Sequence, residues 1–512
     1  KIIMKKIQLL FLMFIVPILS FAQEKGLDQR IDEAFAPISN FFSKTVFFEI
    51  AGYPFVILLL IGSAVFFTVY FGFPNIRYFW TSINVVRGKY DDVEKSDSDS
   101  SDGEVSHFQA LATAVSGTVG NGNIAGVALA IALGGPGATF WMIICGLIGM
   151  SSKFVECTLG VQYRDVGDDG TIYGGPMYYL TKGLKEKGFK TLGKVAAVFF
   201  AIFCIGGSFG GGNAAQSNQA TIVLKQLLGL ESTSSGAIIG LIMAILVGII
   251  IIGGIKRIAS VTEKIVPFMA LLYLIACLYI LLVNFSLVDD AIALIIKEAF
   301  NPTAMGVGGF IGVLMVGFKR AAFSNEAGVG SASIAHSAVK TKYSASEGLV
   351  ALLEPFIDTV VICTMTALVI IIFNFGGAFE YGGDGMGIVL IDGVPYEGAG
   401  ITSKAFAEYI PYSGVFLTIA VVLFAVSTMI SWSYYGLQSW KYLFGRGRIA
   451  DLTYKLIFCM FVVIGSAASM SSIWDFSDAM IFAMVFPNMI GLFFLFPVVK
   501  EQLNKYLEAI KS

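Results

Sequence analysis

A short glycine-rich stretch near residue 120 places amide and hydroxyl side chains inside a segment that is otherwise strongly apolar. Its sequence is GTVGNGNIAG, residues 117–126, and it carries Thr118, Asn121 and Asn123. Glycine tolerates backbone angles that other residues avoid, so a membrane helix is expected to unwind here. The unwound turn would offer carbonyl groups to a small cation and point the next half-helix N-terminus at a carboxylate. A small-residue packing face is the alternative, and two amide side chains in one turn disfavour it.

A second stretch of the same kind follows about two hundred residues later. It reads FSNEAGVGSAS, residues 323–333, and contains Ser324, Asn325 and Glu326. Glu326 is interpreted either as an ion ligand or loop clamp, or as a carboxylate in a structural turn or vestibule. The adjacent cations at 319–320 could neutralise it. Paired breaks in the two halves of an apolar chain indicate the substrate and ion site of a secondary transporter.

A hydroxyl pair and an indole near residue 430 form the next candidate group. Ser427 and Thr428 offer hard oxygen ligands for a sodium-sized cation, and Trp432 offers a wall for a small apolar group. Thr428 and Trp432 are one helical turn apart and so face the same way. Hydroxyl bonding back to the helix carbonyls is the alternative.

Amides in GGSFGGGNAAQSNQ are predicted to face a neighbouring helix or a bound polar substrate. Asn213 and Gln216 are three residues apart and share a helical face, whereas Asn218 lies elsewhere. Gln216 is the candidate for substrate contact, with interhelical hydrogen bonding as the alternative.

Other buried charges are assigned structural roles. Lys153 and Glu156 are interpreted mainly as an intrahelical pair, and Asp358 with Thr359 as structural polar residues.

The composition is that of a membrane protein. Hydrophobic residues make up 56%, charged residues 14%, and the mean hydropathy is +0.78. A net charge of -2 gives no basic face for nucleic acid. The six cysteines lie in apolar segments, and the chain has only two histidines. Their spacing is not that of metal ligands, so we expect no metal other than sodium and no cofactor.

The first residues read as an exported leader. Residues 1–22 combine a basic start, an apolar run and a small-residue end, which predicts a cleavable signal peptide, with an uncleaved helix as the alternative. Residues 23–47 would then form an extracytoplasmic leader, ahead of a peripheral transmembrane helix at 48–73 and a cytoplasmic linker at 74–107.

Ten further segments each contain enough apolar residues to cross a bilayer, which gives eleven predicted spans after signal removal. They lie near 108–134, 139–163, 193–223, 236–254, 262–284, 303–336, 346–374, 412–442, 452–472 and 476–499.

Basic residues predict the orientation of these spans. With the mature N-terminus outside, the connections assigned to the cytoplasm and the tail contain 22 Lys and Arg, and the opposite side contains six. The asymmetry favours an inner-membrane protein with an extracytoplasmic N-terminus and a cytoplasmic C-terminus.

The motifs resemble those of a known family, the alanine or glycine:cation symporters, also called sodium:alanine symporters or amino acid carrier proteins. The resemblance covers about 48–500, with Asn121 standing where Thr is more usual, and it rests on GTVGNGNIAGVALAIALGGPGATFWM, KFVECTLGVQYRD, GGPMYYL, FSNEAGVGSASIAH and FIDTVVICTMTALVI.

The resemblance implies an all-α five-plus-five inverted-repeat transporter fold, in which the ten segments are core helices 1 to 10, helices 1 and 6 are discontinuous and one extra transmembrane helix precedes them. The first repeat would be 108–284, an external connection 285–302, the second repeat 303–499 and a cytoplasmic tail 500–512.

The resemblance also implies site residues. The substrate contacts would be Asn123, Gln216, Thr428, Trp432, Gly122 and Phe323. The sodium contacts would be Thr118, Gly120, Ser427 and Thr428.

The leading hypothesis is therefore sodium-coupled import of alanine and glycine by alternating access. Its partners would be the amino acid, sodium as co-substrate and the lipid bilayer, and the sequence specifies no oligomeric state. Proton coupling for the same substrates, or a non-coupled channel or receptor, are the alternatives. An enzyme is least expected, because no nucleophile and base are recognisable.

Overall fold

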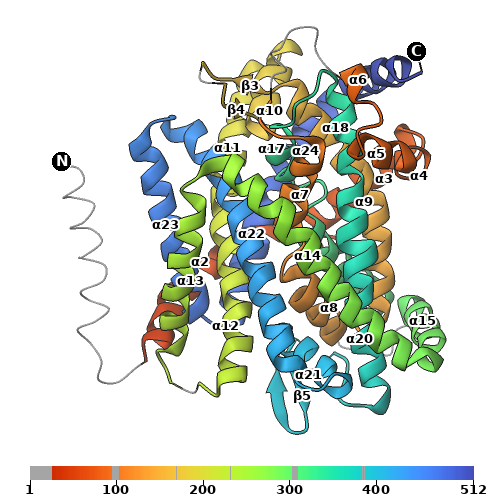
Figure 1. Ribbon diagram of the computed structural model, residues 1–512, viewed down its shortest axis with the longest axis vertical. Helices are drawn as coiled ribbons and strands as arrows, with labels where there is room; N and C mark the ends of the chain where they lie inside the picture. The colour runs from red at the N-terminus through yellow and green to blue at the C-terminus, as the bar shows by residue number, and fades with distance from the viewer. Residues whose placement is uncertain are drawn as a thin grey trace, which may run out of the picture.

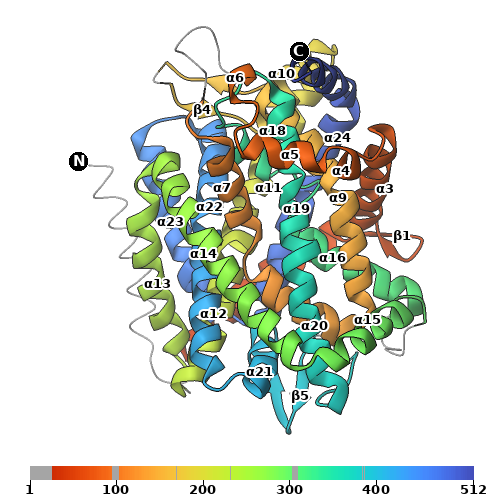
Figure 2. The same cartoon turned by 45° about the vertical axis from the view of Figure 1, so that its right-hand side comes forward.

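The computed structural model describes residues 26–94, 103–168, 170–230, 232–301, 309–382, 385 and 387–511. Within them the chain is a bundle of long helices that run up and down one axis, with short hairpins near residues 165–173 and 389–396 at opposite ends (Figures 1 and 2). The predicted signal peptide lies outside the described residues, as does most of the acidic run in the cytoplasmic linker.

Helices make up most of the described chain. In the first half they are α2 (Leu27–Val46), α3 (Phe55–Tyr70), α4 (Pro74–Arg77), α5 (Phe79–Val86), α6 (Asp91–Glu94), α7 (His107–Thr118), η1 (Gly122–Gly126), α8 (Val127–Gly134), α9 (Gly137–Gln162), α10 (Pro176–Glu186), α11 (Lys190–Phe209), η2 (Gly210–Ala214), α12 (Ala215–Leu228), α13 (Ser235–Ile251) and α14 (Gly254–Val283). In the second half they are α15 (Phe285–Phe300), α16 (Gly309–Asn325), α17 (Ala332–His336), α18 (Ser344–Ala351), α19 (Leu353–Pro355), η4 (Phe356–Cys363), α20 (Thr364–Phe373), η5 (Asn374–Gly376), α21 (Ala399–Tyr409), α22 (Ser413–Phe444), α23 (Arg448–Ala467) and α24 (Met470–Ala509).

Strands occur only as three small antiparallel hairpins among the described residues. They pair β1 (Glu49–Ile50) with β2 (Tyr53–Pro54), β3 (Asp165–Val166) with β4 (Ile172–Tyr173), and β5 (Val389–Ile391) with β6 (Val394–Tyr396).

Seven helical segments in the described chain are long and apolar enough to cross a membrane, and an eighth candidate is a bent pair. Two shorter apolar helices, α3 and α13, occupy the predicted spans at 48–73 and 236–254. The chain is thus a multi-pass helical membrane protein, and the count of eleven spans stays a prediction.

The first predicted break is confirmed. α7 ends at Thr118, and η1 with α8 restarts at Gly122 with a bend of 50°. A side chain at Gly120 has no room, because a Cβ there would lie 2.3 Å from the Thr428 hydroxyl. The glycine therefore permits close approach of two helices, as the sequence suggested.

The second predicted break is confirmed as well. α16 ends at Asn325 and α17 begins at Ala332, and between them Glu326 and Gly328 take positive φ values of 54° and 84°. This backbone is uncommon for a non-glycine residue, so Glu326 must be held by its surroundings.

The π-helical turn η2 makes one face prediction wrong. Asn213 lies in this turn and donates to the Phe458 carbonyl, and Asn218 donates to the Gly465 carbonyl, so both face α23. Gln216 points instead to the first break. A π-turn holds more residues than an α-turn, so the spacing of three no longer places Asn213 and Gln216 together.

The two predicted sides of the membrane lie at opposite ends of the bundle (Figure 1). At one end, the β3–β4 hairpin meets the end of α22 through Asp165 and Arg446 at 2.7 Å, and this guanidinium lowers the pKa of Asp165. Tyr506 of the tail donates to Glu94 at the same end. Which end faces the cytoplasm stays a prediction from charge.

At the other end, the predicted leader forms a docked helix, α2. Asp28 receives hydrogen bonds from the N-terminus of α13 and pairs with Lys225 at 3.2 Å. Phe35 packs edge-on to Phe476 of α24 with ring centroids 5.1 Å apart. α2 therefore ties several helix ends together.

Candidate functional site

The first break and α22 are joined by a reciprocal pair of hydrogen bonds. The Thr428 hydroxyl donates to the Ser116 carbonyl at 3.0 Å, and the Ser116 hydroxyl donates to the Ser427 carbonyl at 2.8 Å. These bonds place the Thr428 oxygen directly beside Gly120. A cation between α7 and α22 would find hydroxyl and carbonyl oxygens together here, which suits a hard ion.

The other two predicted sodium contacts lie differently. The Ser427 hydroxyl turns to the Phe424 carbonyl and to Met269, so only its backbone oxygen faces Ser116. Thr118 bonds back to carbonyls of its own helix at 3.3 and 3.4 Å. The structure therefore brings Gly120 and Thr428 together and leaves the hydroxyls of Ser427 and Thr118 bonded elsewhere.

Ser116 is the residue at this junction that the sequence reasoning missed. It is fully buried and is the hydroxyl residue just before the glycine stretch begins at Gly117. A serine adjacent to a predicted helix break was the available signal.

Gln216 reaches the break at Asn121. Its Oε1 accepts from the Asn121 backbone N–H at 2.9 Å, and the Asn121 side-chain amide donates to the Gln216 carbonyl at 3.1 Å. Asn121 Oδ1 is buried and has no partner within the described part of the chain. This oxygen is thus a hydrogen-bond acceptor that still needs a donor, which a ligand or a water molecule could supply.

Trp432 closes one side of this region. It is 1% exposed, and a Cβ at Gly212 would lie 2.2 Å from its ring, so the indole packs flush against η2. Its Nε1 donates to Glu326 Oε1 at 2.9 Å, and the Ser331 hydroxyl donates to the same carboxylate. Glu326 therefore clamps the second break to α22, which is one of the roles that the sequence left open.

The predicted neutralisation of Glu326 by its neighbours is wrong. Lys319 pairs with Asp478 of α24 at 2.8 Å, and Arg320 pairs with the same carboxylate. Lys319 and Arg320 lie within α16 and face α24, whereas Glu326 follows the last residue of α16.

Phe323 lies on the same side as this charge group. Its ring centroid is 4.8 Å from that of Trp474, and the Arg320 guanidinium lies 5.5 Å from the Phe323 ring. An aromatic and cationic layer thus covers the break on the α24 side.

Asn123 and Gly122, both predicted substrate contacts, face different elements: Asn123 faces η4, and Gly122 faces the end of α16. The Asn123 amide donates to Asp358 Oδ1 at 2.7 Å, while its Oδ1 accepts from the Gly120 N–H at 2.9 Å. A Cβ at Gly122 would lie 3.3 Å from the Ser324 hydroxyl. Asn123 therefore links the first broken helix to η4, and it forms no hydrogen bond with Thr428 or Trp432 among the described residues.

A chain of buried charges runs from Lys153 in α9 to Glu94, near the end of the bundle that carries the tail. The predicted intrahelical pair of Lys153 with Glu156 exists, at 3.8 Å. Lys153 lies closer to Glu354, at 3.0 Å. His336 bonds Glu347 at 2.5 Å and approaches Glu354 at 3.5 Å.

Glu347 extends this chain to His107, which bonds Glu94 at 2.6 Å. Both histidines of the protein thus link helices, and the sequence reasoning assigned them no role.

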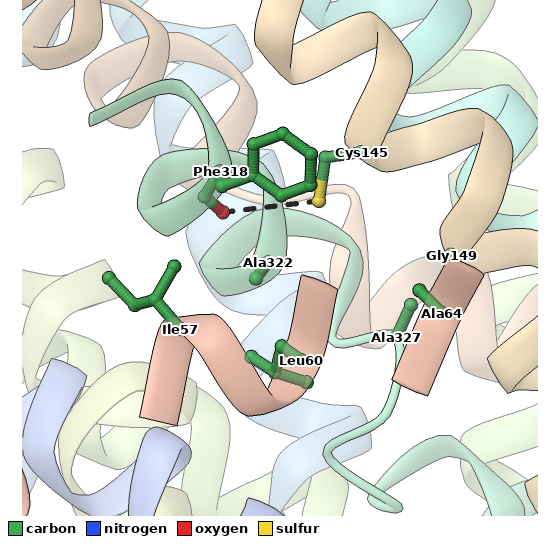
Figure 3. Close-up of a pocket in the computed structure, with 8 residues that line it drawn as sticks. All are labelled: Ile57, Leu60, Ala64, Cys145, Gly149, Phe318, Ala322 and Ala327. Carbon is green, nitrogen blue, oxygen red and sulfur yellow. Dashed lines mark hydrogen bonds between the residues drawn. The ribbon is translucent and has the colours of Figure 1, made fainter. Parts of the chain in front are cut away.

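A separate cavity lies between α3, α9 and α16 (Figure 3). Only about 10 Å³ of it admits the centre of a water molecule. It is lined by Ile57, Leu60, Ala64, Cys145, Gly149, Phe318, Ala322 and Ala327. Such an apolar space is a packing gap between the peripheral helix and α16, because a water needs polar partners.

Comparisons with known proteins agree on one group. The sequence profile described as the Sodium:alanine symporter family matches residues 38–512. The chain is 40% identical to the sodium/alanine symporter AgcS of Methanococcus maripaludis over 460 residues, which covers 90% of this chain and 95% of that protein.

Two relatives from Bacillus subtilis are each 33% identical. The amino-acid carrier protein AlsT is matched over 89% of this chain and 90% of its own length. The protein named probable sodium/glutamine symporter GlnT is matched over 89% and 88%.

The fold also matches a solved structure, that of MhsT in complex with L-phenylalanine. The TM-score is 0.52 at 15% identity, covering 76% of this chain and 89% of that chain. This likeness concerns the fold alone. Together with the two helix breaks and the profile match over nearly the whole chain, the relatives show that the chain belongs to the sodium:alanine symporter family.

Proposed function

We propose that this protein is a sodium-coupled symporter that imports small neutral amino acids, alanine and glycine, by alternating access. The observation that carries the proposal is the junction at Gly120, where a helix break meets the Thr428 hydroxyl and Gln216. Membership of the sodium:alanine symporter family supports sodium as the driving ion.

The polar groups at this junction suit a zwitterion. Asn121 and Gln216 are neutral, and Glu326, the nearby carboxylate, is engaged by Trp432 and Ser331. The amino group would be held by carbonyl and amide oxygens such as Asn121 Oδ1. The carboxylate would meet the N-terminal turn of η1 and α8, where the positive end of the helix dipole favours an anion.

Aromatic residues near the junction would limit the size of the substrate's side chain. Trp432 lies against Gly212, and a Cβ at Gly211 would lie 3.4 Å from the Phe323 ring, so aromatic residues approach this region from two helices. These rings would favour one methyl group over a branched or long side chain, because close-packed interiors tolerate little added volume.

The proposal includes the finer topology. Core helices 1–5 (108–284) and 6–10 (303–499) would form two inverted repeats after the peripheral span at 48–73, with eleven spans in the inner membrane. The end with the β3–β4 hairpin and the tail would face the cytoplasm, as the basic residues indicate.

Uptake of radiolabelled L-alanine into proteoliposomes tests the function. An inward sodium gradient should give saturable and concentrative uptake, and the same liposomes in potassium should give none. Excess glycine should compete with the label more strongly than glutamine does. Uptake that follows a proton gradient without sodium would instead identify a proton-coupled carrier, and non-saturable flux would identify a channel.

A further inference from the structure

Glu326 combines an unfavourable backbone conformation with burial. Its φ is 54°, and its side chain is buried at the start of the second break. Four other non-glycine residues of the described chain have a positive φ, and all four are exposed: Ala51, Phe73, Asp392 and Tyr412. Glycine is the usual residue just after a helix end, because it adopts this backbone without a steric penalty. A glutamate in its place indicates that the side chain itself is needed there.

The two carboxylate oxygens of Glu326 bind two different parts of the molecule. Oε1 accepts from Trp432 Nε1 of α22 at 2.9 Å, and Oε2 accepts from the hydroxyl of Ser331, the residue just before α17. The Glu326 carbonyl also accepts from the Val329 N–H at 3.1 Å. The carboxylate is thus fixed by the loop of the second break, and it fixes the indole in turn.

The other contacts of Trp432 are with apolar atoms and restrain the face of the ring. A Cβ at Gly212 would lie 2.2 Å from the indole, and a Cβ at Gly207 would lie 3.3 Å from it. The Tyr435 ring meets it edge-on with centroids 5.4 Å apart. Packing of this kind does not fix the direction in which the ring points within its own plane. A hydrogen bond is directional, so the bond to Glu326 supplies that restraint.

The indole stands next to the junction that the proposed function uses. Trp432 follows Thr428 by one helical turn, and the Thr428 hydroxyl lies beside Gly120. Gln216, which reaches the same junction, donates to the carbonyl of Gly211 at 2.8 Å, in the turn η2 on which the indole packs. A tilt of the indole would therefore change the space beside Gly120.

We infer that Glu326 is a positioning residue for substrate size: it holds the Trp432 indole in place, so the second break controls the width of the amino acid compartment. The inference rests on the proposed function and deepens it. Trp432 supplies the wall, and the loop 326–331 sets where the wall stands. A rearrangement of that loop would move the wall through the bond between Glu326 and Trp432.

A matched pair of variants tests this in proteoliposomes with labelled L-alanine. Glu326→Gln and Glu326→Met are both neutral and similar in length, but only the glutamine offers an oxygen to Trp432 Nε1, while its amide can donate to Ser331. With Glu326→Met, valine should compete with alanine several-fold better than in the wild type. Glu326→Gln should keep the wild-type competition profile.

A double variant shows whether the effect passes through the indole. When Trp432→Leu has removed the ring, Glu326→Met should change the ratio of valine to alanine affinity no further. Residues that act through one contact give non-additive effects in such a cycle. An additional change of the same size in the Trp432→Leu background would overturn the inference.

A spectroscopic measurement reports the indole without any transport. The protein contains five tryptophans, and 5-fluorotryptophan labelling gives each a ¹⁹F resonance that is assigned by its loss in the Trp→Leu variant. The Trp432 resonance of purified full-length protein should shift or broaden in Glu326→Met and stay near its wild-type position in Glu326→Gln. The Trp440 resonance is the internal control and should not change in either variant.

The remaining outcomes are equally decisive. Wild-type behaviour of both variants would show that Trp432 is held without Glu326, and an identical change in both would show that Glu326 acts by its charge; either result overturns the inference. If Glu326→Met does not fold, Ser331→Ala replaces it, because it frees one carboxylate oxygen and should give a smaller change in the same direction. An unchanged valine competition and Trp432 resonance in Ser331→Ala would then overturn the inference. Absence of sodium-driven alanine uptake in the wild type would contradict the proposed function, whereas the ¹⁹F result would still decide whether Glu326 positions the indole.

Discussion

The hydroxyl oxygen of Thr428 could act in two ways, as a sodium ligand or as the donor of a hydrogen bond between α22 and α7. It donates to the Ser116 carbonyl at 3.0 Å, so its removal costs a hydrogen bond in either case. Thr428→Val should raise the sodium concentration for half-maximal uptake and lower alanine affinity at low sodium, with partial recovery at high sodium. Flux measurements over a range of sodium concentrations check this.

Two further variants separate these roles. Thr428→Ser restores the hydroxyl and should restore the sodium dependence. Thr418→Val, at another buried threonine of α22, should leave it unchanged. If Thr428→Val lowers only protein stability and shows wild-type sodium dependence, Thr428 is not a ligand.

Trp432 is expected to set the size of the accepted side chain. Trp432→Leu removes the indole that packs on Gly212, so valine uptake should rise relative to alanine uptake. One or two methylenes change affinity by about 1–3 kcal/mol, so the preference should shift without an absolute switch. Trp440→Leu, two turns later in the same helix, is the control. Equal competition profiles in both variants would mean that Trp432 is packing only.

At the residue scale, the family resemblance placed Gly120 and Thr428 at one site, and the two residues do meet. Glu326 clamps its loop, which is one of the roles that the sequence left open. The pairing of Asn123 with Asp358 depends on how η1 and η4 face each other across 235 residues, and no local spacing encodes that. Sequence reasoning gave Asp358 only a structural role for this reason.

Among the elements, the break after α7 depends on the absence of a side chain at Gly120. An added Cβ would lie 2.3 Å from the Thr428 Oγ1 and 3.0 Å from Gln216 Oε1, and displacement of Thr428 would break its bond to Ser116. Gly120→Ala should therefore abolish sodium-driven alanine uptake in protein that still reaches the membrane. Gly62→Ala in α3, where an added Cβ meets nothing within 4 Å, should retain wild-type uptake. Normal transport by Gly120→Ala would refute close approach at this junction.

The charge chain through Glu347 should contribute to the stability of the whole helix arrangement. Glu347 is fully buried between His107 and His336, and loss of one partner from a buried pair costs about 3–5 kcal/mol. Glu347→Ala should lower the unfolding temperature of the purified protein strongly. Glu501→Ala, which removes an exposed pair with Lys505, should change it little. Equal unfolding temperatures for the two variants would contradict the role of this chain.

Helices and two of the breaks were predictable because apolar length and glycine clusters are local signals. The π-turn η4 was not, since FIDTVVIC contains no glycine. Pro355 precedes it and lacks an N–H for the helix ladder, which is a physical reason for a change in turn. Proline alone is a poor predictor, because Pro267 lies within the unbroken helix α14.

For the whole molecule, the distribution of basic residues predicts the sidedness. Cysteines introduced one at a time at Ser101 and Ser234, in a background without the native cysteines, should react with impermeant reagents from opposite sides. Ser101 lies outside the described residues, in the predicted cytoplasmic linker, and Ser234 precedes α13 at the other end. Labelling of both from the same side would contradict the topology.

The sequence did not predict how the N-terminal segment packs on the rest of the molecule. Residues 23–47 were expected to be an extracytoplasmic leader, and nothing in the pattern used showed that Leu27–Val46 forms a helix docked on α24. Contacts between segments so far apart in sequence arise from the packing of all the helices between them.

That docking has a consequence for biogenesis. The Ser39 hydroxyl bonds the Ser472 carbonyl at 2.7 Å across 433 positions, and Asp32 accepts from the Ser469 N–H at 2.9 Å. Synthesis delivers α2 long before α24 exists, so the apolar face of α2 must remain uncovered until the last helix is inserted. A nascent chain arrested before α24 should present α2 to proteases and chaperones. The completed protein should protect α2 from both, so cleavage within α2 would report whether the last helix has been assembled.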